Sequence, residues 1–190
     1  MADNESLRWK IGRRKKLLHT PIYDVLSQHE TAPNGVEGDY IAIKAPDWVI
    51  VIPETENDFL MVKQFRHSEG DVTVEFPGGV VDPGEKPEDA AARELREETG
   101  CEAEIVTLGA LNPNPALFTN RVHVFLAKDP HRVGDLSLDP DELLNVFPVP
   151  KNEVIAQMER NGIKGVNLAL MPFIENDKYH GGSETPETWR

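Results

Sequence analysis

The chain has 190 residues, of which 39% are hydrophobic and 28% are charged, and its formal net charge is −13. This length and composition fit one well-cored globular domain with a small appendage. The acidic balance argues against nonspecific binding to nucleic acid or to anionic membranes, because both require a basic surface. No apolar run is long enough for a membrane span or a signal peptide, and a single cysteine excludes an internal disulfide. We therefore expect a cytoplasmic protein.

The N-terminal part of the chain is expected to form a basic arm followed by strands. Arg13, Arg14, Lys15 and Lys16 form a basic patch, interpreted as a solvated arm, with a phosphate or partner contact as the alternative. From Thr20 onwards, short runs rich in β-branched and aromatic residues are separated by turn residues, which is typical of antiparallel strands. The strands predicted in this half are 20–28, 39–45, 47–53, 59–65 and 72–77.

One helix is predicted after these strands, from about Lys86 to Thr99. Three alanines precede long straight-chain residues there, and Gly100 supplies the stop. The remaining predicted segments are strands at 103–111, 121–127 and 144–149, a polar surface loop at 128–142, and helical patterns after 150 and at 166–174.

The predicted helix carries three carboxylates on one face, because Glu94, Glu97 and Glu98 stand at i, i+3 and i+4. Like charges at this spacing destabilise a bare helix by roughly 0.2–0.5 kcal/mol per pair. A solvated acidic face, balanced by nearby arginines, is the simplest interpretation of such a run. Here the turn at Gly78–Gly79 would also bring free backbone carbonyls close to the carboxylates. Hard divalent cations prefer such all-oxygen surroundings, so the pattern favours a metal site.

The segment Gly79–Cys101 resembles the Nudix hydrolase signature. The positions that match it are Gly79, Glu85, Arg93, Glu94, Leu95, Glu97, Glu98 and Gly100. Only Cys101 departs, where the pattern prefers Ile, Leu or Val, and cysteine is itself a small hydrophobe. The resemblance implies an α/β (α+β) fold, a Nudix α/β/α sandwich with a mixed sheet, here with an added N-terminal antiparallel β element. We expect an arm and β element at 1–45, the Nudix domain at 46–178 and a polar tail at 179–190.

The residues before the signature look like the ADP-ribose and ADP-sugar pyrophosphatase branch of this family. The residues that carry this likeness are Gln64, Phe65, Arg66, Glu75, Phe76, Pro77, Gly78 and Gly79. The planar fork of Arg66 suits phosphate oxygens, and a pair with Glu75 is the alternative role. Pro113 and Pro115 fall short of the position where branch members usually carry a proline, which leaves other nucleoside diphosphate sugars, such as GDP-mannose, open.

The resemblance implies hydrolysis of a nucleoside diphosphate linked to a sugar, with ADP-ribose, cleaved to AMP and ribose 5-phosphate, as the favoured substrate. It also implies Mg²⁺ as the cofactor, with Mn²⁺ as the alternative. The metal ligands that it implies are Glu94, Glu98, Glu97 and the carbonyl of Gly78. The substrate contacts that it implies are Arg66 and Glu75. Glu85 and Arg93 are expected to hold the loop and the helix together.

A general base is expected on the polar loop, where Asp139, Asp141 and Glu142 cluster. We favour Glu142, because it stands just before an apolar strand that can aim it. Glu97 is kept as a further candidate for a catalytic role.

Trp9 is a candidate to stack on the nucleobase, whereas Trp48 lies in a predicted strand and is interpreted as core. A homodimer is expected, with N-terminal strands of one subunit contributing to the substrate pocket of the other. Two other classes are alternatives: a nucleotide-sensing module that does not cleave, and an isomerase of isoprenoid diphosphates. The first commonly lacks signature glutamates, and none is missing here.

Overall fold

The structure is a computed structural model that describes residues 4–140, 142–154 and 156. The chain divides into two compact units. One consists of the residues up to 48 together with 110–122, and the other of residues 49–109 together with those from 123 onwards. The first unit thus combines the expected N-terminal element with a loop from much later in the chain.

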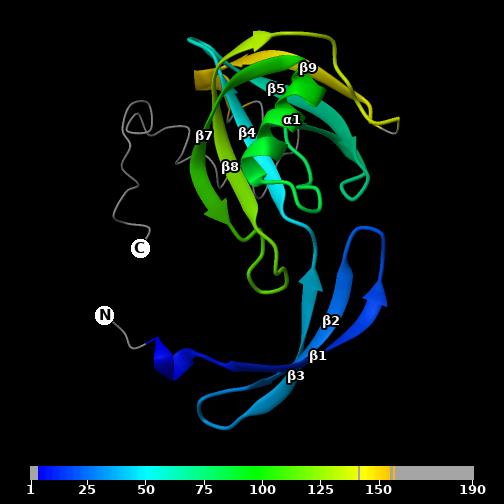
Figure 1. Cartoon of the computed structure of the whole chain (residues 1–190), viewed down its shortest axis with the longest axis vertical. Coiled ribbons are helices and arrows are strands. Elements are labelled where there is room, and N and C mark those ends of the chain that lie inside the picture. The colour runs from blue at the N-terminus through cyan, green and yellow to red at the C-terminus, as the bar shows by residue number, and fades with distance from the viewer. Residues whose placement is uncertain (1–3, 141, 155, 157–190) are drawn as a thin grey trace. The chain divides into compact units, whose positions relative to one another are not determined.

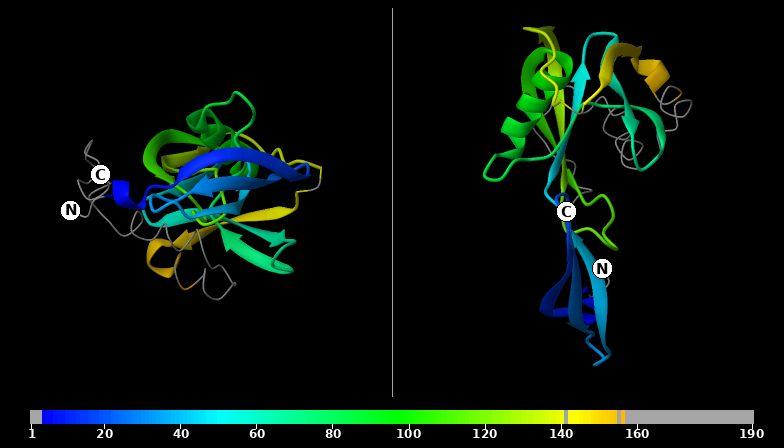
Figure 2. Two further views of the ribbon diagram at one scale, coloured as in Figure 1. Left: turned by 90° about the horizontal axis from the view of Figure 1, so that it is seen from below. Right: turned by 90° about the vertical axis from the view of Figure 1, so that its right-hand side faces the viewer.

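The first unit contains a three-stranded antiparallel sheet (Figures 1 and 2). Its elements are η1 (Glu5–Leu7), β1 (Lys10–His19), β2 (Asp24–Thr31) and β3 (Glu37–Lys44). β2 and β3 pair along their whole length. The turn between them contains Gly35 with a φ of 84°, a left-handed conformation that glycine adopts at little cost. The predicted N-terminal antiparallel element is confirmed.

The basic patch lies on strand β1, which the sequence did not predict. β1 pairs with β2, but the register shifts between Ile11 and Arg14 and again between Lys16 and Leu18. These irregularities interrupt the period-2 alternation from which strands are predicted. Every residue of β1 is exposed. No buried apolar position therefore marks the strand in the sequence, although the cations are solvated as expected.

The second unit is built on a six-stranded sheet, in the order β6-β5-β4-β8-β7, with β9 paired to β5. Its strands are β4 (Trp48–Glu54), β5 (Asp58–Arg66), β6 (Asp71–Glu75), β7 (Cys101–Leu111), β8 (Val122–Arg132) and β9 (Leu144–Pro150). β9 runs antiparallel to β5, with Leu144 opposite Gln64. This pairing brings the residues just before β9 to the end of β5 where Arg66 lies.

Helix α1 (Pro87–Thr99) packs on this sheet (Figure 1). Gly100 ends it in a left-handed conformation, and its N–H bonds to the carbonyl of Arg96 at 2.8 Å. The predicted α/β fold and the predicted helix are confirmed. Within the described residues α1 is the one α-helix longer than a turn. The late helical patterns and the tail at 179–190 lie almost entirely outside those residues.

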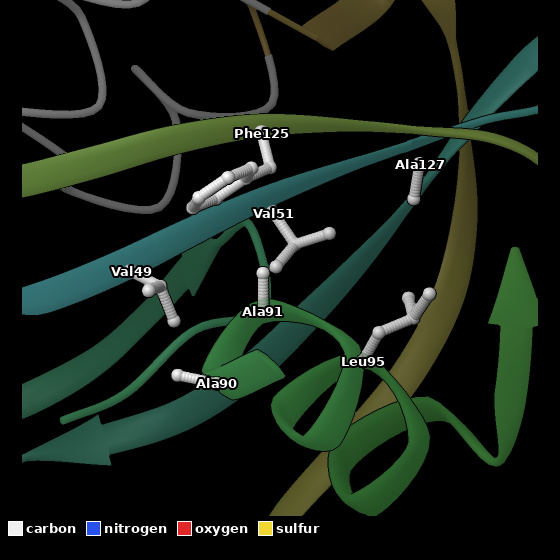
Figure 3. Packing of buried hydrophobic residues seen from close by; sticks show 7 residues of the cluster. All are labelled: Val49, Val51, Ala90, Ala91, Leu95, Phe125 and Ala127. Atoms are coloured by element: carbon white, nitrogen blue, oxygen red, sulfur yellow. The ribbon is translucent and has the colours of Figure 1, made fainter. Parts of the chain in front are cut away.

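The core between α1 and the sheet fixes which way the helix faces. Figure 3 shows its members from three elements, Val49, Val51, Ala90, Ala91, Leu95, Phe125 and Ala127. The small side chains of the two alanines let the helix lie close to the sheet. Burial of a larger side chain such as Leu95 contributes about 1.5–3 kcal/mol to the stability of the fold. Residues 94 and 98 border 91 and 95 on a helix. Packing of the apolar face therefore carries two carboxylates toward the sheet.

Among the predicted boundaries, two shift the most in the structure. The strand predicted from Thr20 begins at Asp24, because Thr20 Oγ1 donates to the carbonyl of Tyr23 at 2.7 Å and closes a turn. The predicted loop at 128–142 begins only after Arg132, because β8 continues through Pro130. This extension is largely exposed, which is why its sequence is polar. No helix in the part of the chain described here is long and apolar enough to cross a membrane.

Candidate active site

Glu94 and Glu98 are buried although both are carboxylates, with 9% and 3% of their surface exposed. Buried carboxylates normally have a cationic partner. Glu97, one residue round the helix, is turned outward, and its side chain is 38% exposed. The structure therefore brings Glu94 and Glu98 to the sheet side of α1 and leaves Glu97 at the edge.

The turn before α1 fits closely around these two carboxylates. The N–H of Gly78 donates to Glu98 Oε2 at 2.8 Å. A Cβ on Gly79 would overlap the carboxylate of Glu94, and a Cβ on Gly78 would overlap the carbonyl of Val49. Gly78 therefore needs glycine because a backbone atom blocks a side chain there, whereas a side chain at Gly79 would displace the carboxylate of Glu94.

Backbone pairing of this turn with β4 uses alternate carbonyls. Val49 N–H donates to the carbonyl of Gly79 at 2.8 Å, and Val51 N–H to that of Pro77 at 2.9 Å. The carbonyl of Gly78, between them, takes no part in this pairing.

Arg93 joins the signature loop to the helix. Its guanidinium donates to both carboxylate oxygens of Glu85 at 3.0 Å and to the carbonyl of Val80 at 3.0 Å. It also donates to Glu94 Oε1 at 2.8 Å and Glu97 Oε2 at 3.0 Å. These bonds raise the pKa of Arg93 and lower that of Glu85. The contacts are those expected of residues that hold the loop in place.

Arg66 forms a two-pronged pair with Glu75, the alternative that the sequence left open. Arg66 Nε and Nη2 donate to the two Glu75 oxygens at 2.9 and 2.7 Å. The hydroxyl of Thr73 bonds to the same carboxylate, a contact that the sequence did not predict. Burial works to raise the pKa of Glu75, but the Arg66 and Thr73 bonds outweigh it and hold the pKa below its usual value. An arginine has five N–H donors, and this pair uses two.

The positive charge near the two buried glutamates does not offset the effect of their burial. Burial raises the pKa of Glu94, and the charges of Glu97 and Glu142 add to the effect, while Arg93 opposes it. Burial also raises the pKa of Glu98 to about 8, with Glu94 and Glu142 contributing, against the Gly78 hydrogen bond and the charge of Arg66. A carboxylate in this position is costly to ionise unless a cation joins it.

A divalent cation suits the carboxylates of Glu94, Glu97 and Glu98 together with the carbonyl of Gly78. Their oxygens do not point at one common position in this structure. Among the described residues, no three His, Cys, Asp or Glu side chains are spaced to hold a metal ion. Of the three glutamates expected to bind metal, Arg93 donates to Glu94 and Glu97, and the N–H of Gly78 donates to Glu98. These residues nevertheless fit a divalent cation, because all of the donor atoms are oxygens. Two of the carboxylates are buried with too little positive charge around them. The glycine turn places no side chain between them and a cation.

The loop after β8 ends close to this cluster. Glu142 affects the pKa of Glu94, Glu98 and Arg66. Its Oε2 accepts a hydrogen bond from the N–H of Asp139 at 3.2 Å, and its own N–H donates to the carbonyl of Asp139 at 3.0 Å. Asp139 is itself a candidate base, and Asp141, the third candidate on this loop, lies outside the described residues.

Both candidate tryptophans lie in the first unit. Trp9 is 37% exposed and packs edge-to-face on Tyr40, with ring centroids 5.4 Å apart. Trp48 is partly buried and lies 6.4 Å, centroid to centroid, from Phe118.

Comparison with known proteins agrees with this geometry. The NUDIX domain family matches residues 44–167. The ADP-ribose pyrophosphatase of Bacillus subtilis (strain 168) is 33% identical over 168 residues, which cover 87% of this chain and 91% of the relative. The ADP-sugar pyrophosphatase of Mus musculus is 33% identical over 130 residues, 63% of this chain and 60% of the relative. The fold is shared with a crystal structure of an ADP compounds hydrolase, with a TM-score of 0.75, 23% identity, and coverage of 93% of this chain and 98% of that one.

The chain therefore belongs to the Nudix family, and it is a hydrolase. Within the family it is similar to the ADP-ribose pyrophosphatase-like branch, as the residues around Arg66 predicted. The hydrolase prediction is confirmed.

Proposed function

We propose that this hydrolase cleaves the pyrophosphate bond of ADP-ribose, or of a closely related ADP-sugar, to AMP and a sugar phosphate. The observation that carries the proposal is the pair Glu94 and Glu98, buried beside the Gly78–Gly79 turn with too little positive charge around them. Such a pair suits a cation that accompanies a diphosphate. The names of the Bacillus and mouse relatives support an adenosine diphosphate derivative as the substrate.

The residues that would hold Mg²⁺ or Mn²⁺ are Glu94, Glu98, Glu97 and the Gly78 carbonyl. A bound divalent cation would neutralise charge on the diphosphate and acidify the attacking water. Glu94 and Glu97 would exchange part of their bonding to Arg93 for this role. Arg93 would keep Glu85 and the loop in place meanwhile, through the bonds that it makes to both Glu85 oxygens.

The other groups of the site bind the substrate and move a proton. Arg66, held by Glu75, would direct its remaining N–H groups at phosphate oxygens. Glu142 would accept a proton from the attacking water, after its carboxylate releases the N–H of Asp139. Asp139 and Asp141 remain the alternative bases on the same loop.

We also propose a homodimer whose N-terminal sheet takes part in base binding. Large apolar side chains are exposed on β1 (Ile11, Leu17 and Leu18) and on the turn that follows it (Ile22 and Tyr23), and a second copy could cover them. Trp9, already ordered against Tyr40, is the candidate to stack on the base. Light scattering at micromolar concentration should give twice the mass of one chain, and a monomer would contradict the proposal. The proposed location remains the cytoplasm.

Product identification tests the proposed reaction. Purified protein, ADP-ribose and Mg²⁺ should yield AMP and ribose 5-phosphate in equal amounts. EDTA should stop the reaction and excess Mg²⁺ restore it. Glu98→Gln serves as the matched inactive variant, and Glu102→Gln, on an exposed side chain beyond the helix, as the active control. Release of inorganic phosphate alone, or binding without cleavage, would contradict the proposal.

A further inference from the structure

The first part of the loop after β8 is docked on the C-terminal end of α1. The last carbonyls of a helix lack partners within the helix. The loop supplies one for Glu97, whose carbonyl accepts the N–H of Ser137 at 2.9 Å. The carbonyl of Gly100 accepts the N–H groups of Val133 and Gly134 at 2.8 and 3.2 Å. Three backbone donors of one loop therefore bind the end of the helix that carries the signature glutamates.

Gly100 makes this docking possible in two ways. Its φ of 70° is a left-handed conformation, which side chains with a Cβ adopt at a cost. A Cβ at this position would also overlap the carbonyl of Gly134, a backbone atom that cannot turn aside. Any larger residue at 100 would have to push the loop away from the helix.

The other end of the same loop is fixed by the sheet. Leu144 lies opposite Gln64 in the pairing of β9 with β5, two residues before Arg66. Glu142 thus lies between two anchors, the helix end at 133–137 and the strand that begins at Leu144. A loop held at both ends cannot swing as a whole, and the position of Glu142 depends on both anchors.

We infer that Gly100 is a positioning residue of the hydrolase: by admitting residues 133–137 to the end of α1, it sets the reach of Glu142 toward Glu98. The inference rests on the proposed function, because it concerns the group proposed there as the base. A displacement near 1 Å at such a group can cost up to about 100-fold in rate. The effect should fall on kcat, since Gly100 is not among the residues proposed to bind the substrate.

Two variant pairs separate docking from general strain. Gly100→Ala adds both the left-handed strain and the overlap with the loop. Gly84→Ala adds the strain alone, because Gly84 has a φ of 87° and open space around it. Likewise Ser137→Pro removes the N–H that binds Glu97, whereas Ser137→Ala keeps it. Gly100→Ala and Ser137→Pro should each lower kcat for ADP-ribose about ten-fold or more with KM within about three-fold. The two controls should retain wild-type kcat, and melting temperatures identify any variant that fails to fold.

Combination with Glu142→Gln decides whether the docking acts through Glu142. In the Glu142→Gln background, Gly100→Ala should lower kcat by less than about two-fold, because the group that it positions is already lost. If the double variant lost kcat by the product of the two single-variant factors, the inference would be overturned. Wild-type activity of Glu142→Gln, with Glu98→Gln inactive, would overturn it too while leaving the hydrolase proposal intact. An active Glu98→Gln variant would instead contradict the proposed function.

Discussion

The backbone N–H of Gly78 donates a hydrogen bond to Glu98 Oε2 at 2.8 Å, across the boundary between the glycine turn and α1. It is the one hydrogen bond to this buried carboxylate that the described residues provide, and it is not enough to keep the pKa of Glu98 near its usual value. The turn thus orients the carboxylate without neutralising it. That combination leaves a place for a cation.

Glu98→Gln should lower kcat by at least about 100-fold, equivalent to about 2.7 kcal/mol of barrier. Glutamine keeps the size of the side chain and an oxygen that can accept the Gly78 N–H, so only the charge is lost. Steady-state kinetics with Mg²⁺ measure the loss of kcat, and melting curves show whether the variant is still folded. A folded Glu98→Gln enzyme with near wild-type kcat would show that Glu98 holds no catalytic metal.

The stability of the metal-free protein should depend on pH through Glu98. Its folded pKa of about 8 lies above the ordinary value of 4.5, so the folded state binds this proton more tightly than the unfolded state. The stabilisation from this group is complete below about pH 4.5 and is lost as pH rises through about 8. In EDTA, Glu98→Gln should therefore match the wild type near pH 5 and exceed it by a few kcal/mol near pH 9, since one pKa unit is about 1.36 kcal/mol. Parallel stability curves for the two proteins would contradict this expectation.

Alanine at the two glycines of the turn should give opposite kinds of defect. Gly79→Ala meets the end of a flexible side chain, Glu94, which can move away. It should lower kcat about ten-fold or more with little change in melting temperature. Gly78→Ala meets the backbone carbonyl of Val49, and overpacking of this kind costs about 1–3 kcal/mol of stability. Melting temperature and kcat should be measured for both variants. The expectation is contradicted if Gly79→Ala is less stable and more active than Gly78→Ala.

Arg66→Lys should raise KM about ten-fold and lower stability slightly. A lysine cannot reproduce the two parallel bonds to Glu75 and also point further donors at phosphate. Arg96→Lys is the matched control, because Arg96 pairs with Glu102 on the exposed side of the same unit. Unchanged KM in Arg66→Lys would mean that Arg66 serves only to neutralise Glu75.

Much of this site could be predicted from the sequence, because the spacing of charges on a helix is local. The i, i+3, i+4 pattern of Glu94, Glu97 and Glu98 and the stop at Gly100 needed no tertiary information. Tertiary information was needed to tell which of these glutamates are buried and which is exposed. Which carboxylate is buried depends on the packing of Ala91 and Leu95 against the sheet, and the sequence pattern treats all three alike.

Other features depended on contacts between residues far apart in the chain. Strand β1 escaped prediction because its register irregularities and full exposure remove the hydrophobic alternation. Docking of Ser137 on Glu97 joins residues 40 positions apart through backbone atoms, which carry no signal in the side-chain sequence. The two roles offered for Arg66 could not be separated until the sheet placed Glu75 beside it.

The most direct test of the central proposal is kcat/KM for ADP-ribose, ADP-glucose, GDP-mannose, NADH and diadenosine polyphosphates, measured side by side with Mg²⁺. Stacking on an aromatic face accepts any base, so the preference for adenine must appear in these numbers. We expect ADP-ribose, or another ADP-sugar, to have the highest kcat/KM. A preference of more than about ten-fold for a substrate without adenosine would contradict the proposed specificity.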